Sequence, residues 1–216
     1  MDAQVFVDLA RYTHIVAVAI GFGAAFLTDM HALRHLAAPI DKSFISSMHA
    51  YHTTIWYSVI AMWITGLVMI YIRTGFDLAS FTPKLFAKLV TVSLLTINAQ
   101  FIGAKVMPLI KLNRGHSLMS LPLKAKLRLA AIGAVSTASW MLALALGSSK
   151  ILAVSGLITF VICMPIVYLG AIMMAVSVMY LLHLGAQMAP GQSGSLGPSF
   201  VAVQRPMPLI LSRKAS

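Results

Sequence analysis

Apolar residues along this chain form five long runs, separated by short polar or basic stretches. Each run is about as long as the roughly 20 helical residues that cross a hydrocarbon core of about 30 Å. The sequence lacks the alternating ten-residue patterns of membrane strands, and a helix satisfies its own backbone hydrogen bonds in lipid. The pattern therefore predicts an all-α integral membrane bundle of five transmembrane helices, near residues 9-28, 50-72, 85-106, 128-147 and 151-182.

Composition supports this class, because 59% of the residues are hydrophobic, 10% are charged and the mean hydropathy is +0.89. The first run follows Asp2 and Asp8 instead of a basic segment, so we expect a retained helix and not a signal peptide. The last run is longer than a straight crossing needs, which predicts a tilt or a bend at Pro165. The single Cys163 excludes an intrachain disulfide and any multi-cysteine metal site within one copy.

Basic residues predict the orientation, because short loops rich in Lys and Arg stay in the cytoplasm. With the connection between the third and fourth runs inside, eleven basic residues lie inside and four outside, and Lys88 is left in the membrane. This places the N-terminus outside and the C-terminus in the cytoplasm, in a bacterial inner membrane. The net charge of +11 is then mainly a topology signal that also attracts anionic lipids. The basic connection has no interleaved aromatic residues, so we expect no nucleic-acid partner.

Lys88 is the strongest functional signal in the sequence, because it lies inside the third apolar run. A cation at the centre of a membrane helix costs roughly 2.5 to 3.5 kcal/mol, so an intramembrane lysine is by default a functional-site hypothesis. In the predicted topology His14 of the first helix and Lys88 lie at a similar depth near the outer face, which indicates a shared site. Alternatively, His14 bonds to a neighbouring helix and Lys88 extends its ammonium group to the outer headgroups.

Two helix faces accompany this pair. Small residues continue the face of His14, namely Ala17, Gly21 and Ala25. Such a stripe either lets another helix approach closely or leaves room for a flat ligand. On the third helix a broad face shared with Lys88 carries Thr91, Leu95 and Asn98.

Three segments carry a resemblance to a known family: "YTHIVAVAIGFGAAFL", "MHAYHTTIWYSVIAMWITGLVMIY" and "PKLFAKLVTVSLLTINA". They resemble the first three helices of the HemJ family of protoporphyrinogen oxidases and of the related CopD-like membrane domains, over about residues 10-110. In that family a histidine of the first helix and a lysine of the third are associated with b-type haem. These positions correspond to His14 and Lys88. The chain departs from HemJ after the first helix, where it reads "FLTDMHALRHL", so haem binding is implied more directly than protoporphyrinogen oxidation.

The resemblance implies that His14 and Lys88 bind the haem iron, that Ala17 and Gly21 make room for the ring, and that Asn98 supports the site by a hydrogen bond. Imidazole is a common axial ligand of haem iron, and a lysine amine can coordinate when it is neutral. Electrons would then pass to a membrane quinone or to a partner protein. The resemblance leaves open whether the chain is an enzyme.

A second group of histidines lies at the predicted inner face. His31 and His35 are four residues apart at the end of the first helix, and His49 and His52 are three apart at the start of the second, so each pair shares a helix face. Four imidazoles could bind a transition metal or a second haem. A quinone headgroup site, a proton relay and ordinary interfacial histidines are the alternatives.

The sequence divides into a transmembrane domain over residues 1-186 and a cytoplasmic tail over 187-216. The tail is rich in Gly, Ser and Pro, which predicts no stable structure of its own, yet its apolar stretches "FVAV" and "PLILS" could dock on a membrane-protein partner or a second copy. We interpret the chain as a b-haem-binding redox or assembly protein. The competing interpretation is a non-catalytic accessory subunit of a respiratory or photosynthetic membrane complex. Copper transport is third, because the scattered methionines fit core packing better.

Overall fold

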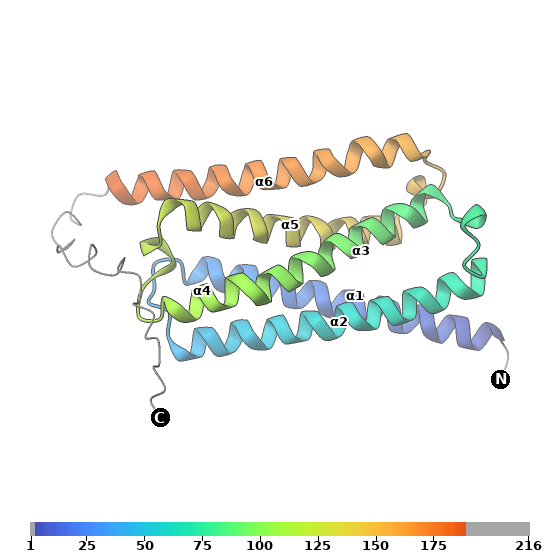
Figure 1. The fold of residues 1–216 in the computed structure, drawn as a ribbon, viewed down its shortest axis with the longest axis horizontal. Helices are drawn as coiled ribbons and strands as arrows, with labels where there is room; N and C mark the ends of the chain where they lie inside the picture. Colours follow the sequence, from blue (N-terminus) through green and yellow to red (C-terminus); the bar gives the residue numbers. More distant parts are fainter. Residues whose placement is uncertain (1–2, 189–216) are drawn as a thin grey trace, which may run out of the picture.

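The computed structural model describes residues 3–188 and folds them into a bundle of long helices (Figure 1). Five helical stretches are long and apolar enough to cross a membrane, which confirms the predicted class. Four of the spans are the single helices α1 (Ala3–Arg34), α2 (Lys42–Thr74), α5 (Leu123–Ser148) and α6 (Leu157–Met188). The third span is continuous but consists of three elements, α3 (Pro83–Phe101), the π-helical turn η2 (Ile102–Val106) and α4 (Met107–Leu112). Short 3-10 turns are η1 (Leu78–Ser80), η3 (Leu118–Ser120) and η4 (Ile151–Ala153).

Capping residues explain why two helices begin before the apolar runs that predicted them. The Asp41 carboxylate accepts a hydrogen bond from the Phe44 amide at 2.7 Å, so α2 begins at Lys42. Thr82 caps α3 in the same way, and Pro83 occupies the first helical position, where its missing N–H has no cost. At the other end of the chain, α6 extends to Met188, and the rest of the predicted tail lies outside the described residues.

The third span changes geometry before Pro108. Proline lacks an N–H and its ring clashes with the preceding turn, so a helix that continues through it must adjust locally. Here the adjustment is the π-helical turn η2. It packs against α2, because a Cβ on Gly103 would lie 2.9 Å from Nε2 of His52. Glycine at position 103 therefore lets the third span approach α2 closely.

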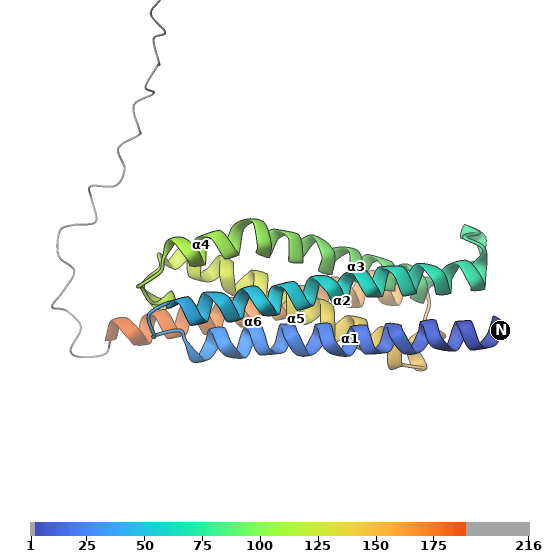
Figure 2. The ribbon, with the colours of Figure 1, turned by 90° about the horizontal axis from the view of Figure 1, so that it is seen from below.

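Successive spans run antiparallel (Figures 1 and 2). α1 packs against α2, α5 against α6, and α3 contacts both α2 and α5. The α1–α2 and α4–α5 connections and the end of α6 lie at one end of the bundle, and the start of α1 lies at the other with the α2–α3 and α5–α6 connections. We term these the inner end and the outer end, following the orientation predicted from the basic residues.

Three buried clusters hold the spans together. The central cluster joins α1, α2, α3 and α5 around the fully buried Trp140. A second cluster joins α2, α4 and the inner connections, and a third joins α3, α5 and α6. Four methionines belong to these buried regions, which favours packing over copper handling for them: Met48, Met62, Met107 and Met164.

Candidate functional site

His14 lies in the outer half of α1 and faces α2. Its Nδ1 is 2.8 Å from Oγ1 of Thr65, and its ring packs beside Gly66. The Thr65 hydroxyl is also 2.6 Å from the carbonyl of Ala61, to which it donates, and this favours a hydrogen bond from His14 to Thr65. The contact therefore favours the neutral tautomer with its proton on Nδ1 and a lone pair on Nε2.

Lys88 lies in the second turn of α3, half-buried, and close enough to His14 for its charge to act on the imidazole. Lys84 and Arg73 in turn lie within electrostatic range of Lys88. The Lys84 ammonium donates to the carbonyl of Ser149 at 2.6 Å, which holds it at the α5–α6 connection. The charge of Lys88 therefore acts on the His14 imidazole, although among the described residues no hydrogen bond joins the two side chains.

The small-residue stripe of α1 is filled by a side chain from α5. A Cβ on Gly21 would overlap Cη2 of Trp140 and would lie 2.8 Å from both Cζ2 of Trp140 and Cβ of Ser58. Ala17 and Ala25 are buried in the same central cluster. Of the two predicted uses of the stripe, the structure has close packing. The expectation that Ala17 and Gly21 leave room for a porphyrin ring is corrected, because the indole of Trp140 occupies that space.

The predicted polar face of α3 makes one side-chain hydrogen bond to α5, through Asn98. Asn98 donates from Nδ2 to the carbonyl of Ile132 at 3.2 Å, and it lies about 15 Å further along the helix than Lys88. The Thr91 hydroxyl donates to the Ala87 carbonyl within its own helix. Asn98 thus joins α3 to α5, and the prediction that it supports the His14–Lys88 site is corrected.

The four inner histidines remain two separate pairs. Over residues 3–188, no group of three or more His, Cys, Asp or Glu side chains is placed to hold a metal ion. His31 and His35 lie with ring centroids 4.3 Å apart, and Nδ1 of His35 donates to the carbonyl of His31 at 2.9 Å. His52 accepts from Nε1 of Trp56 at 3.1 Å, and His49 is exposed. The predicted metal cluster is corrected, because these imidazoles do not converge.

The polar contacts between helices that were not predicted include one made by Lys126 and one made by Asp29. Lys126 is only 3% exposed and donates to the carbonyl of Met119 at 3.0 Å and to Nδ1 of His183 at 2.9 Å. The sequence analysis placed Lys126 in a basic connection. In the structure it lies on the buried side of α5, where its ammonium group joins α5 to α6. Thr137 of α5 donates to the Asp29 carboxylate of α1 at 2.6 Å. The sequence signal for the Thr137–Asp29 contact was Asp29 itself, because a carboxylate within a membrane span needs a polar partner.

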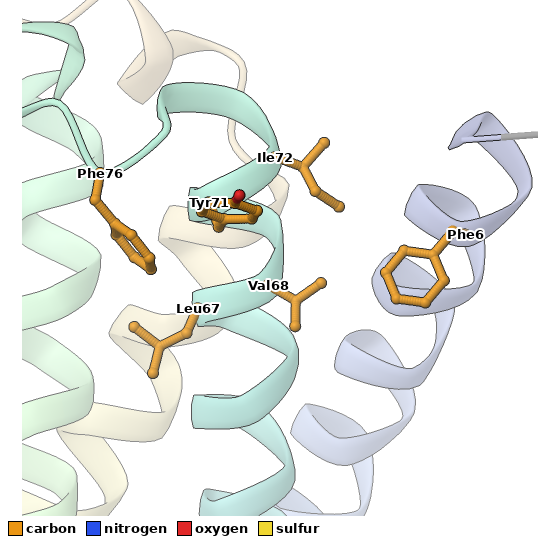
Figure 3. Close-up of a pocket in the computed structure, with 6 residues that line it drawn as sticks. All are labelled: Phe6, Leu67, Val68, Tyr71, Ile72 and Phe76. Atoms are coloured by element: carbon orange, nitrogen blue, oxygen red, sulfur yellow. The ribbon is translucent and has the colours of Figure 1, made fainter.

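An apolar groove of about 530 Å³ opens between the outer ends of α1 and α2 (Figure 3). Its walls are Phe6, Leu67, Val68, Tyr71, Ile72 and Phe76. Phe6 on α1 faces Val68 and Ile72 on α2, and Phe76 comes from the turn after α2. Leu67 follows Gly66, which packs on the His14 ring, so the groove lies on the outer side of the His14–Thr65 contact.

Comparison with protein-family models, with curated proteins and with solved structures gives no match to this chain. The chain is a multi-pass helical membrane protein. A more specific function has to be argued from the geometry of its side chains.

Proposed function

We propose that this protein binds b-type haem through His14 at the outer end of the bundle, as an inner-membrane redox or assembly protein of the HemJ and CopD kind. The observation that carries the proposal is the orientation of His14. A hydrogen bond from Nδ1–H of His14 to the Thr65 hydroxyl, which itself donates to the Ala61 carbonyl, would leave the lone pair of Nε2 for a metal. Metal-ligating histidines usually donate their other ring N–H to a fixed partner, and that partner sets the tautomer and the ring orientation.

The charges around the site support an anionic, metal-containing ligand. Haem presents an iron atom together with two propionate carboxylates, so it suits a site that combines an imidazole with nearby cations. Lys88, Lys84 and Arg73 supply these cations. Lys88 has two roles open to it: a neutral amine would be a second axial ligand, whereas an ammonium group would pair with a propionate.

The donor atoms fit haem, but the ring position predicted from the small-residue stripe does not, because Trp140 fills the space at Gly21. The apolar groove that contains Phe6 and Leu67 lies on the outer side of His14, but neither His14 nor Lys88 is one of its walls, so the ring would reach Nε2 of His14 only if the side chains between them move. Bound haem would supply one-electron transfer, with a membrane quinone or a partner protein as the proposed electron partner. The residues of the chain would bind the iron, orient the ligand and neutralise its carboxylates.

The test is the haem content of variants purified in mild detergent after expression with haem supplied. His14→Ala should lose most of the haem. Thr65→Val keeps the size of the side chain but cannot accept a hydrogen bond from the His14 ring, so haem affinity should fall about 10- to 100-fold. His49→Ala is the matched control, since His49 is an exposed histidine at the opposite end. Full haem retention by His14→Ala would overturn the assignment.

Lys88 is tested separately, by the spin state of the ferric protein. If its amine coordinates the iron, Lys88→Met should convert a six-coordinate low-spin spectrum into another ligation state. If its ammonium pairs with a propionate, the spectrum should stay unchanged while haem dissociates faster. An unchanged spectrum together with unchanged dissociation would exclude both roles.

A second candidate function, a non-catalytic accessory subunit, is favoured by the Asp29–Thr137 contact. Thr137 is exposed on the surface of α5, where it bonds to the half-buried Asp29. Polar groups on a membrane-facing surface are costly in lipid and suit the surface of a neighbouring helix. A colourless protein that co-purifies with other subunits in a fixed ratio, and loses them in Thr137→Leu, would favour this function.

A further inference from the structure

A basic groove lies at the inner end of the bundle, between α2 and α4. It has a volume of about 470 Å³, and its walls are Lys42, Ile45, Ser46, His49, Ala50, Lys111 and Arg114. Lys42 begins α2, whereas Lys111 and Arg114 come from the end of the third span, so the cations are brought together by the fold. The groove combines three full positive charges with an apolar strip.

Helix periodicity explains why these side chains share one groove. Phe44 and Met48 of α2 are buried against Met107 and Ile110 of α4. Side chains next to this buried stripe point along the edge of the same interface, since neighbouring positions on a helix differ by about 100°. Lys111 follows Ile110, and Ile45 and His49 follow Phe44 and Met48, so these side chains lie at that edge, whereas Ser46 and Ala50 lie further round the exposed face of α2. The buried contact therefore fixes one edge of the groove.

The backbone of the inner connections fixes the two ends of the groove. The amide of Gly115 donates to the Ile40 carbonyl, and the amide of Ile40 donates to the His116 carbonyl, both at 2.9 Å. Gly115 has φ of +86°, which side-chain-bearing residues rarely adopt, and this turn directly follows Arg114. These bonds hold the chain near Lys42 beside the chain near Arg114. The groove is therefore formed without a ligand.

Among residues 3–188, no carboxylate lies within ion-pair distance of the groove cations. Over residues 3–188, the one ion pair within 4 Å joins Arg11 and Asp8, at the outer end. Asp41 precedes Lys42, but its carboxylate accepts the Phe44 amide hydrogen bond as the cap of α2. Like charges in one groove repel one another, so an anion bound among them would be stabilised.

We infer that this groove binds the phosphate headgroup of an anionic phospholipid. Lys42, Lys111 and Arg114 supply charge and hydrogen-bond donors for the phosphate, and the Ser46 hydroxyl adds a neutral donor. Ile45 and Ala50 form the apolar part of the wall, which would contact the glycerol and the first acyl carbons of the lipid. Basic clusters at the cytoplasmic ends of membrane helices attract anionic lipids. The inference does not depend on the proposed haem site.

The experiment measures lipid retention by the full chain in a neutral detergent, by native mass spectrometry. The probes are phosphatidylglycerol, phosphatidylcholine and free glycerol 3-phosphate. Phosphatidylglycerol should bind and should compete against an excess of phosphatidylcholine. Each of Lys42→Gln, Lys111→Gln and Arg114→Gln should weaken it about fivefold, the factor that corresponds to about 1 kcal/mol per cation.

The triple groove variant Lys42→Gln, Lys111→Gln and Arg114→Gln should lose phosphatidylglycerol, and its matched control is a triple variant at exposed cations of the same end, Lys105→Gln, Lys124→Gln and Arg128→Gln, which changes the net charge equally. The control should retain phosphatidylglycerol. Ala50→Trp fills the groove without changing charge and should also lose the lipid, with the melting midpoint measured for each variant to confirm folding. Equal losses in the control triple, equal binding of phosphatidylcholine, or binding of free glycerol phosphate as tight as that of the lipid would each overturn the inference.

Discussion

Replacing Gly21 by alanine tests the packing of Trp140 against α1. The added Cβ would overlap Cη2 of Trp140 and would lie 2.8 Å from Cζ2 of the same ring and from Cβ of Ser58. The indole is fully buried among side chains of four helices, so it has no open space into which it could move. Overpacking of this kind costs about 1–3 kcal/mol.

Helix propensity acts in the opposite direction, because alanine in a helix interior is favoured over glycine by up to about 1 kcal/mol. We therefore expect Gly21→Ala to lower the free energy of unfolding by about 1–2 kcal/mol. Gly23→Ala is the matched control, since a Cβ there meets nothing within 4 Å. It should raise the free energy of unfolding by about 0.5–1 kcal/mol.

The assay is equilibrium unfolding in mixed micelles of a mild detergent and dodecyl sulfate, followed by far-ultraviolet circular dichroism. A double-mutant cycle supplies the second arm: in a Trp140→Leu background, Gly21→Ala should cost at least about 1 kcal/mol less than in the parent. If Gly21→Ala and Gly23→Ala shift stability equally, or if Trp140→Leu does not relieve the cost, the indole does not occupy the space beside Gly21.

Two further substitutions test contacts at the inner half of the bundle. Gly103→Ala should lower the free energy of unfolding by up to about 2 kcal/mol, because its Cβ would lie 2.9 Å from Nε2 of His52 and the gain in helix propensity offsets part of this overpacking. Gly170→Ala, with open space around it, should not lower it. Equal melting midpoints for the two variants would contradict the close approach of the third span to α2. Lys126→Met should cost about 1.5–3 kcal/mol in the same unfolding assay, since it leaves the Met119 carbonyl and Nδ1 of His183 without their donor. Lys124→Met, at an exposed neighbour, should change stability little. A similar loss of stability in both variants would show that the hydrogen bonds of Lys126 do not stabilise the bundle.

The five spans could be predicted from the sequence because lipid imposes length and apolarity on each helix separately. The limits of the spans were less predictable, since they depend on capping: Asp41 and Thr82 start α2 and α3 earlier than the apolar runs do. The last span begins later than predicted, at Leu157, because residues Ile151–Ala153 form a separate 3-10 turn. Hydropathy alone cannot separate such a turn from a helix.

The positions of His14 and Lys88 along their helices predict a common depth, and in the structure the charge of Lys88 acts on the His14 imidazole. That the two residues form one site stays a prediction. The pattern on α1 could not show which helix faces Gly21, because a stripe of small residues is compatible with any bulky neighbour. Trp140, 119 positions later in the chain, is that neighbour. Asn98 was assigned to the wrong contact for the same reason, since its partner on α5 is a backbone carbonyl.

Haem binding is the central claim, and a visible absorption spectrum tests it most directly. The full chain is expressed with haem supplied, purified in mild detergent and measured oxidised and after dithionite reduction, with haem quantified against protein. The account predicts a Soret band and reduced α and β bands of b-type haem at a stoichiometric amount. A folded protein without porphyrin absorbance would contradict the proposed role of His14.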